Sequence, residues 1–147
     1  MMTFSIERIQ LPELLGFLFT QEEDTFPERK EEKRLKMLAE KWCEYAEFCT
    51  CRGDDGKLVG MIAFYANRPD TRTAFIIRVY VSPLSRRIGI FHKMLHLVQN
   101  HIKQSGYTHL RLEVMKNNAI AQKAYLKHGF HYEKDSNSQT YFMQKNL

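Results

Sequence analysis

Residues 111–130 read R-L-E-V-M-K-N-N-A-I-A-Q-K-A-Y-L-K-H-G-F, and this stretch decides which fold the chain is expected to adopt. It begins inside a run in which apolar residues occupy every second position, a pattern that predicts a strand over residues 108–115. Asparagines then interrupt the run, and Asn118 is of a residue type that caps the start of a helix. We predict this helix over Ala119–Lys127, with Gly129 just past its end. The alternating apolar residues are Leu110, Leu112 and Val114.

A second strand and a second helix lie upstream and are joined by a short basic turn. The β-branched and aromatic residues of 73–82 predict the strand, and apolar residues at intervals of three and four predict a helix over 89–105. The turn between them contains R-R-I-G-I. The N–H groups at a helix start favour an anion, and Arg86, Arg87 and Gly89 add charge and close backbone approach. This segment is therefore a candidate phosphate site.

Together the two segments resemble the acyl-CoA site of the GNAT superfamily of acyl-CoA-dependent N-acyltransferases. The pattern N-x-x-A-x-x-A-Y-x-x-x-G-F, which runs from Asn118 to Phe130, is similar to the second half of that site. The basic turn is similar to the pyrophosphate loop R/Q-x-x-G-x-G/A, whose first two fixed positions are matched by Arg86 and Gly89. Phe91 departs from the third position, where Gly or Ala is usual.

The resemblance covers nearly the whole chain and implies one N-acetyltransferase domain, residues 1–147. The predicted elements follow the order β-α-α-β-β-β-α-β-α-β-β, which is also the order of the GNAT fold. We therefore expect an α/β fold with a central, mixed, mostly antiparallel sheet of about six or seven strands and about four flanking helices. One of these helices is expected to start at Pro27 and to carry an amphipathic stripe to about Ala46.

The resemblance also implies roles for particular residues. Tyr125 matches the tyrosine that lies near the CoA sulfur and is the usual candidate acid, although a core aromatic is the alternative. Glu113 matches the catalytic glutamate of some members, notably N-terminal protein acetyltransferases, although an ion-paired strand residue is the alternative. No metal ligand is expected. The residues expected to hold CoA are Val79, Val81, Arg86, Arg87, Ile88, Gly89, Ile90, Phe91, Asn118, Ala121 and Tyr125.

The group that removes the proton from the amine is left open by the sequence. Histidine suits a general base by its pKa, and the helix predicted over 89–105 carries His92, His96 and His101. However, His92 and His96 lie one turn apart on a face that is expected to be exposed, so solvated histidines are the favoured interpretation. Proton removal through water, with no dedicated base, remains an alternative to Glu113.

The composition is that of an ordinary globular protein, with 44% hydrophobic and 27% charged residues among 147. The formal net charge of +5 suits a polyanionic cofactor such as CoA, and no interleaved basic and aromatic nucleic-acid motif accompanies it. No apolar run has the length of a membrane span, and the first residues lack the order of a signal peptide. We therefore expect a cytoplasmic protein with no membrane or nucleic-acid partner.

The leading hypothesis is an N-acyltransferase that uses acetyl-CoA as cosubstrate, without a metal, and acts on a small-molecule or peptide amine. A non-catalytic CoA-binding or partner-binding module on the same fold is the alternative, with Phe91 as the sign of a degraded site. A small basic nucleic-acid-binding domain fits the charge but lacks a motif. The sequence identifies neither the acceptor nor the oligomeric state, and a homodimer is left open.

Overall fold

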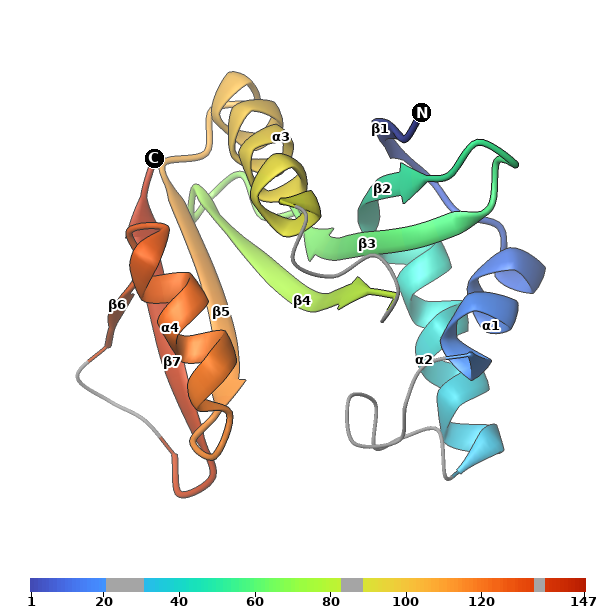
Figure 1. Cartoon of the computed structure of the whole chain (residues 1–147). Coiled ribbons are helices and arrows are strands. Elements are labelled where there is room, and N and C mark those ends of the chain that lie inside the picture. Colours follow the sequence, from blue (N-terminus) through green and yellow to red (C-terminus); the bar gives the residue numbers. More distant parts are fainter. Residues whose placement is uncertain (21–30, 83–88, 134–136) are drawn as a thin grey trace. The chain divides into compact units, whose positions relative to one another are not determined.

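The structure is a computed structural model that describes residues 1–20, 31–82, 89–133 and 137–147. These residues form seven strands and four helices in the predicted order (Figure 1). The α/β fold class expected from the sequence is thereby confirmed. The elements are β1 (Thr3–Glu7), α1 (Leu11–Phe19), α2 (Glu32–Tyr45), β2 (Glu47–Arg52), β3 (Leu58–Tyr65), β4 (Thr73–Val81), α3 (Ile90–Gln104), β5 (His109–Met115), α4 (Ala119–Lys127), β6 (His131–Tyr132) and β7 (Thr140–Asn146).

The strands of the described residues form one mixed sheet in the order β1-β2-β3-β4-β5-β7-β6. β4 and β5 are parallel, because the chain crosses from one to the other through α3. β1 with β2, β5 with β7, and β6 with β7 are antiparallel. The mixed, mostly antiparallel sheet predicted from the element order is therefore confirmed.

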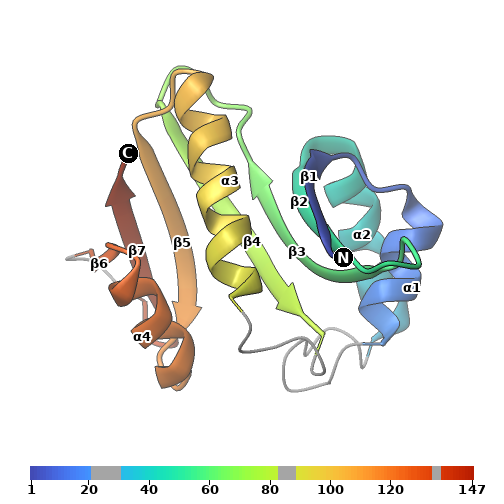
Figure 2. The ribbon, with the colours of Figure 1, turned by 45° about the horizontal axis from the view of Figure 1, so that its top comes forward.

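The described chain divides into two compact units. Unit 1 comprises residues 1–63 and 78–98, and unit 2 comprises residues 64–77 and 99–147. In unit 1, α1 and α2 pack side by side (Figure 2). In unit 2, α4 lies along β5 and β7 (Figure 2). That residues 1–147 act as one N-acetyltransferase domain stays a prediction.

Unit 1 is built on apolar faces that the sequence predicts for α2 and α3. Both helices bury residues at intervals of three and four, so each places one stripe in the core. α2 begins at Glu32, preceded by Glu31 in an extended conformation, so it starts later than the helix predicted from Pro27. Pro27 itself lies outside the described residues. The buried stripes are Leu35, Ala39 and Trp42 on α2 and Met94, Leu95 and Val98 on α3.

The core of unit 2 follows the period-two pattern of β5. Leu110, Leu112 and Val114 are buried, whereas Glu113 and Met115 between and after them are exposed. Successive side chains of a strand point to opposite faces, so the apolar set faces the core and Glu113 faces away from it.

A polar network joins β1, β2 and α1 in unit 1. Arg52 Nη2 lies 2.7 Å from Glu7 Oε1, and Arg52 Nη1 lies 2.7 Å from Glu13 Oε2. Glu7 Oε2 also accepts hydrogen bonds from the hydroxyls of Ser5 and Thr50, at 2.8 and 2.5 Å. The hydrogen bond from Arg52 lowers the pKa of Glu7 to about 2, against the opposing effect of partial burial.

Replacing Glu7 with glutamine is expected to lower the free energy of unfolding at pH 7 by about 2 kcal/mol, the size of a charge-assisted hydrogen bond. Because the pKa of Glu7 is lower in the folded chain, the stabilisation is complete above its usual value near 4.5 and is lost as the pH falls towards 2. Urea unfolding between pH 2 and 7 checks this. The exposed residue Glu40, on α2, supplies the control Glu40→Gln, which should change little. A Glu7→Gln difference that is the same at pH 2 and pH 7 would contradict the prediction.

Candidate active site

The start of α3 in unit 1 carries the described part of the predicted phosphate loop. Gly89 has φ of 80°, a left-handed conformation that other residues rarely adopt, and α3 begins at the next residue. The Lys93 N–H donates to the Gly89 carbonyl at 3.1 Å, which closes the first turn. A Cβ atom built at Gly89 meets no atom within 4 Å, so the space beside this backbone is open. Arg86, Arg87 and Ile88 lie outside the described residues.

The end of β4 leads into this loop. Tyr80 is buried, whereas Val79 and Val81 on either side of it keep part of their surface exposed, as expected of residues on the other face of the strand. Ile90 is buried at the start of α3, and Phe91 beside it is partly exposed. A large ring therefore does occupy the position at which the loop departs from the usual Gly or Ala.

Gly60, which the sequence analysis did not single out, holds α3 close to the sheet. A Cβ atom at this position of β3 would lie 3.1 Å from the carbonyl oxygen of Tyr80 and 3.3 Å from Met94 Cε. It would also lie 3.5 Å from Ile90 Cγ2, at the start of α3. Only glycine leaves this space empty without displacing the start of α3. A glycine inside an otherwise apolar strand is the sequence signal that indicates such a close approach.

The second motif forms the predicted capped helix in unit 2. The Asn118 side-chain oxygen accepts a hydrogen bond from the Ala121 N–H at 3.1 Å, which confirms the N-cap. Gly129 follows the helix with φ of 91°, as predicted for the position past its end. Gln122 fixes the turn before α4, because its amide donates to the carbonyls of Met115 and Lys116 at 2.9 and 3.0 Å.

Tyr125 is held at the last turn of α4 by the residues that follow the helix. The Phe130 N–H donates to the Tyr125 carbonyl at 3.0 Å, and the two rings meet edge to face with 5.7 Å between centroids. Burial raises the pKa of the Tyr125 phenol to about 12. The phenol therefore keeps its proton at neutral pH and can donate a hydrogen bond without carrying charge.

The Glu113 carboxylate lies on the exposed side of β5 and contacts the first residue of β7 and the chain before it. Its Oε2 atom accepts hydrogen bonds from Thr140 Oγ1 at 2.6 Å and from Asn137 Nδ2 at 3.2 Å. These partners are what a hydrogen-bonded strand residue would have, and they also fix the direction of the carboxylate. The role of Glu113 as a base stays a prediction.

A family model identifies the chain. The model of the GNAT acetyltransferase family matches residues 15–130, which is most of the sequence. This chain belongs to the GNAT acetyltransferase family. The resemblance read from the two motifs is thereby confirmed. No curated protein matches this GNAT protein in sequence.

Solved structures share the fold of this GNAT protein at low sequence identity. The PaiA N-acetyltransferase from Thermoplasma acidophilum, solved in complex with coenzyme A, has a TM-score of 0.73 at 19% identity, with 99% of each chain covered. A GNAT-family acetyltransferase from Staphylococcus aureus Mu50 has a TM-score of 0.77 at 19% identity, also with 99% of each chain covered. The ribosomal-protein-S18-alanine N-acetyltransferase from Escherichia coli has a TM-score of 0.73 at 18% identity, covering 99% of this chain and 94% of its own.

The described residues contain neither a candidate membrane-spanning helix nor a candidate metal cluster. No helix in the described ranges has the length and hydropathy of a membrane span. Within the same ranges, no group of three or more His, Cys, Asp and Glu side chains is placed to hold a metal ion.

Lys145 is a residue near the second motif that the sequence analysis did not identify. Its Nζ atom donates to the His128 carbonyl at 2.6 Å, at the C-terminal cap of α4. Partial burial lowers the pKa of this lysine. A cation at the carboxyl end of a helix satisfies an unpaired carbonyl and opposes the helix dipole. Because β7 supplies it, no local signal in 118–130 could have indicated it.

Proposed function

We propose that this GNAT protein is an N-acyltransferase that moves an acetyl group from acetyl-CoA to a primary amine of a small molecule or peptide. The observation that carries the proposal is the half-buried Tyr125, on a helix capped by Asn118, whose phenol pKa is raised to about 12 by desolvation. Family membership supports acyl transfer, and the complex of PaiA with coenzyme A supports the donor. No metal is invoked.

Binding of the donor is assigned to the start of α3 and the strand before it. The first N–H groups of a helix lack partners within the helix and point outward, so the open backbone at Gly89 suits a diphosphate. In the proposal, the backbone N–H groups of the 86–91 loop hold that diphosphate, and Arg86 and Arg87 neutralise its charge. Val79, Val81, Asn118 and Ala121 are the other proposed contacts of the donor.

The chemical step requires an uncharged amine and a stabilised leaving group. The amine nitrogen attacks the thioester carbonyl, the C–N bond forms, and the C–S bond breaks to release a thiolate. In the proposal, the Tyr125 hydroxyl donates a hydrogen bond to this thiolate. Its pKa of about 12 lies above the value of about 8.5 typical of a cysteine thiol, so hydrogen bonding is favoured over complete proton transfer. The proton lost by the amine goes to Glu113 or to water.

A thiol-release assay with acetyl-CoA and a panel of amines tests the proposal. The panel contains peptide N-termini, lysine, polyamines and aminosugars, and each reaction is compared with one that lacks the amine. Amine-dependent release of CoA, with the acetylated amine found by mass spectrometry, is the expected result. Binding of acetyl-CoA without turnover of any amine would instead favour the non-catalytic module, for which Phe91 in the first turn of α3 is the specific observation.

Replacing Gly89 with valine is expected to weaken acetyl-CoA binding about tenfold. A β-branched residue at φ of 80° costs on the order of 1–2 kcal/mol in backbone strain, which shifts the loop away from its binding conformation. A Cβ at this position meets nothing, so the fold itself should remain intact. Calorimetric titration with acetyl-CoA measures the change.

Two variants control for the Gly89 measurement. Gly89→Asn tolerates the left-handed conformation and should bind nearly as well as the wild type. Gly56→Val places the same strain at φ of 78° in the turn between β2 and β3 and should leave the affinity unchanged. Wild-type affinity in Gly89→Val would remove the loop from the proposed binding site.

A further inference from the structure

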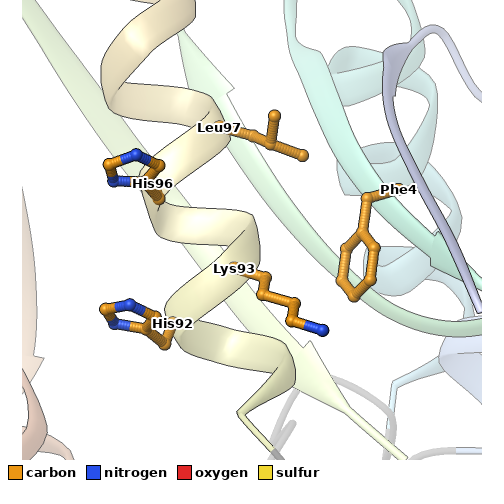
Figure 3. A pocket seen from close by; sticks show the side chains of 5 residues that line it. All are labelled: Phe4, His92, Lys93, His96 and Leu97. Atoms are coloured by element: carbon orange, nitrogen blue, oxygen red, sulfur yellow. The ribbon is translucent and has the colours of Figure 1, made fainter.

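Two histidines project from the same side of α3 in unit 1. His92 and His96 are one turn apart, and both are exposed. Their rings are nearly parallel, with an angle of 16° between planes and 6.5 Å between centroids. Figure 3 shows both rings on one side of the helix, whereas Lys93 and Leu97 turn towards Phe4 on β1.

We propose that His92 and His96 together bind one divalent transition-metal ion of the Zn²⁺, Ni²⁺ or Cu²⁺ class. Imidazole nitrogen is a preferred ligand of these three ions. Each nitrogen lies about 2.0–2.1 Å from such a metal, so the two ligating nitrogens must come within about 4 Å of each other. Side chains four residues apart on a helix are already neighbours, with Cβ atoms about 5–6 Å apart. Both side chains are exposed, so rotation about their side-chain bonds is the movement that would close the remaining gap, and His92 would exchange a contact that it makes in the structure for the metal.

Lys93, which follows His92 in the sequence, points towards β1. It places its Nζ atom 5.6 Å from the centroid of the Phe4 ring. In Figure 3 this ammonium group lies on the opposite side of α3 from the two imidazoles. The attraction of a cation to the aromatic face favours this position. The ammonium group of Lys93 therefore does not lie between the two imidazoles, although Lys93 lines the same pocket.

The number of protein ligands determines how tightly the site binds the metal ion. Within the described ranges, no third His, Cys, Asp or Glu joins the pair. Water would fill the other coordination positions of the metal. The two histidines line an open pocket of about 360 Å³ together with Phe4, Lys93 and Leu97, so water can reach them. A two-ligand site of this kind binds more weakly than a closed four-ligand site, and its occupancy follows the available metal. It is separate from the proposed acetyl transfer, in which no metal takes part.

Calorimetric titration of the untagged chain of residues 1–147 with NiCl₂ tests the inference. We expect one equivalent to bind to the wild type, and we expect His92→Gln and His96→Gln each to weaken that binding by at least about tenfold, because either change leaves a single ligand. His131→Gln is the matched control, because His131 is an exposed histidine on β6. It should bind Ni²⁺ like the wild type.

Cu²⁺ electron paramagnetic resonance provides a second readout that does not depend on enzymatic activity. The Cu²⁺ spectrum of the wild type should show splitting by two equivalent nitrogen ligands, and this two-nitrogen pattern should be lost in each single variant. Ni²⁺ should raise the Tm of the wild type in thermal denaturation, because only the folded helix presents both ligands to the metal. It should not raise the Tm of the single variants, which keep one ligand. Wild-type Ni²⁺ affinity in both variants, or loss in only one of them, would overturn the two-histidine site.

Discussion

Replacing Tyr125 with phenylalanine is expected to lower kcat for acetyl transfer by about a hundredfold, the lower range for loss of a group that acts on a proton in the transition state. Only the hydroxyl is removed, so the edge-to-face contact with Phe130 remains and the fold should persist. The affinity for acetyl-CoA should change little, because the proposed hydrogen bond strengthens only as the thiolate forms. Steady-state kinetics and calorimetric titration with acetyl-CoA separate the two effects.

The pKa of Tyr125 adds a second expectation for the wild type. Burial raises it to about 12, so the phenol keeps its proton until the pH approaches that value. Deprotonation of the Tyr125 phenol should therefore cause no fall in kcat between pH 7 and 10. Tyr132→Phe is the matched control, because the Tyr132 hydroxyl donates to Gln122 Oε1 on the surface of the same unit. Unchanged kcat in Tyr125→Phe, with chemistry rate-limiting, would return Tyr125 to the role of a core aromatic.

The parts of the fold predicted most closely are those whose signals are local in the sequence. The helix predicted over Ala119–Lys127 has the same bounds in the structure, because Asn118 caps its start and Gly129 ends it. The strand over 108–115 is recovered as His109–Met115, because alternate burial needs only the residues of the strand itself. Both predictions use interactions within a few residues.

The contacts that define the environment of the candidate site could not be predicted because they join distant residues. Lys145 caps α4 from a position 17 residues beyond its partner His128, and Thr140 contacts Glu113 across 27 residues. These pairs depend on the register between β5 and β7, which no pattern within either strand fixes alone. The raised pKa of Tyr125 depends in the same way on how deeply the phenol is buried.

The proton of the amine is removed either by a carboxylate of the protein or by water, and Glu113 is the proposed carboxylate. It is the only carboxylate on β4 and β5. Its hydrogen bonds from Thr140 and Asn137 both reach Oε2, so they orient the carboxylate through one oxygen. A base held in a fixed direction loses less in positioning when an amine binds, which is consistent with the proposal.

Replacing Glu113 with glutamine is therefore expected to lower the rate at pH 7 by roughly two orders of magnitude, since the shape is kept and the base is lost. The deficit should shrink as the pH rises, because the uncharged amine becomes abundant without help from the protein. The rate as a function of pH, measured for an amine found in the thiol-release assay, provides the test. Thr140→Val is the matched control, because it removes the 2.6 Å hydrogen bond and leaves the carboxylate in place.

The two variants distinguish a catalytic role from a structural one. If Glu113 is the base, Glu113→Gln changes the pH dependence of kcat, whereas Thr140→Val keeps the wild-type profile with a modest loss of rate. If Glu113 only joins β5 to the chain before β7, both variants lower the Tm to a similar extent and leave the profile unchanged. The second pattern would assign proton removal to water and leave Tyr125 as the proposed catalytic side chain.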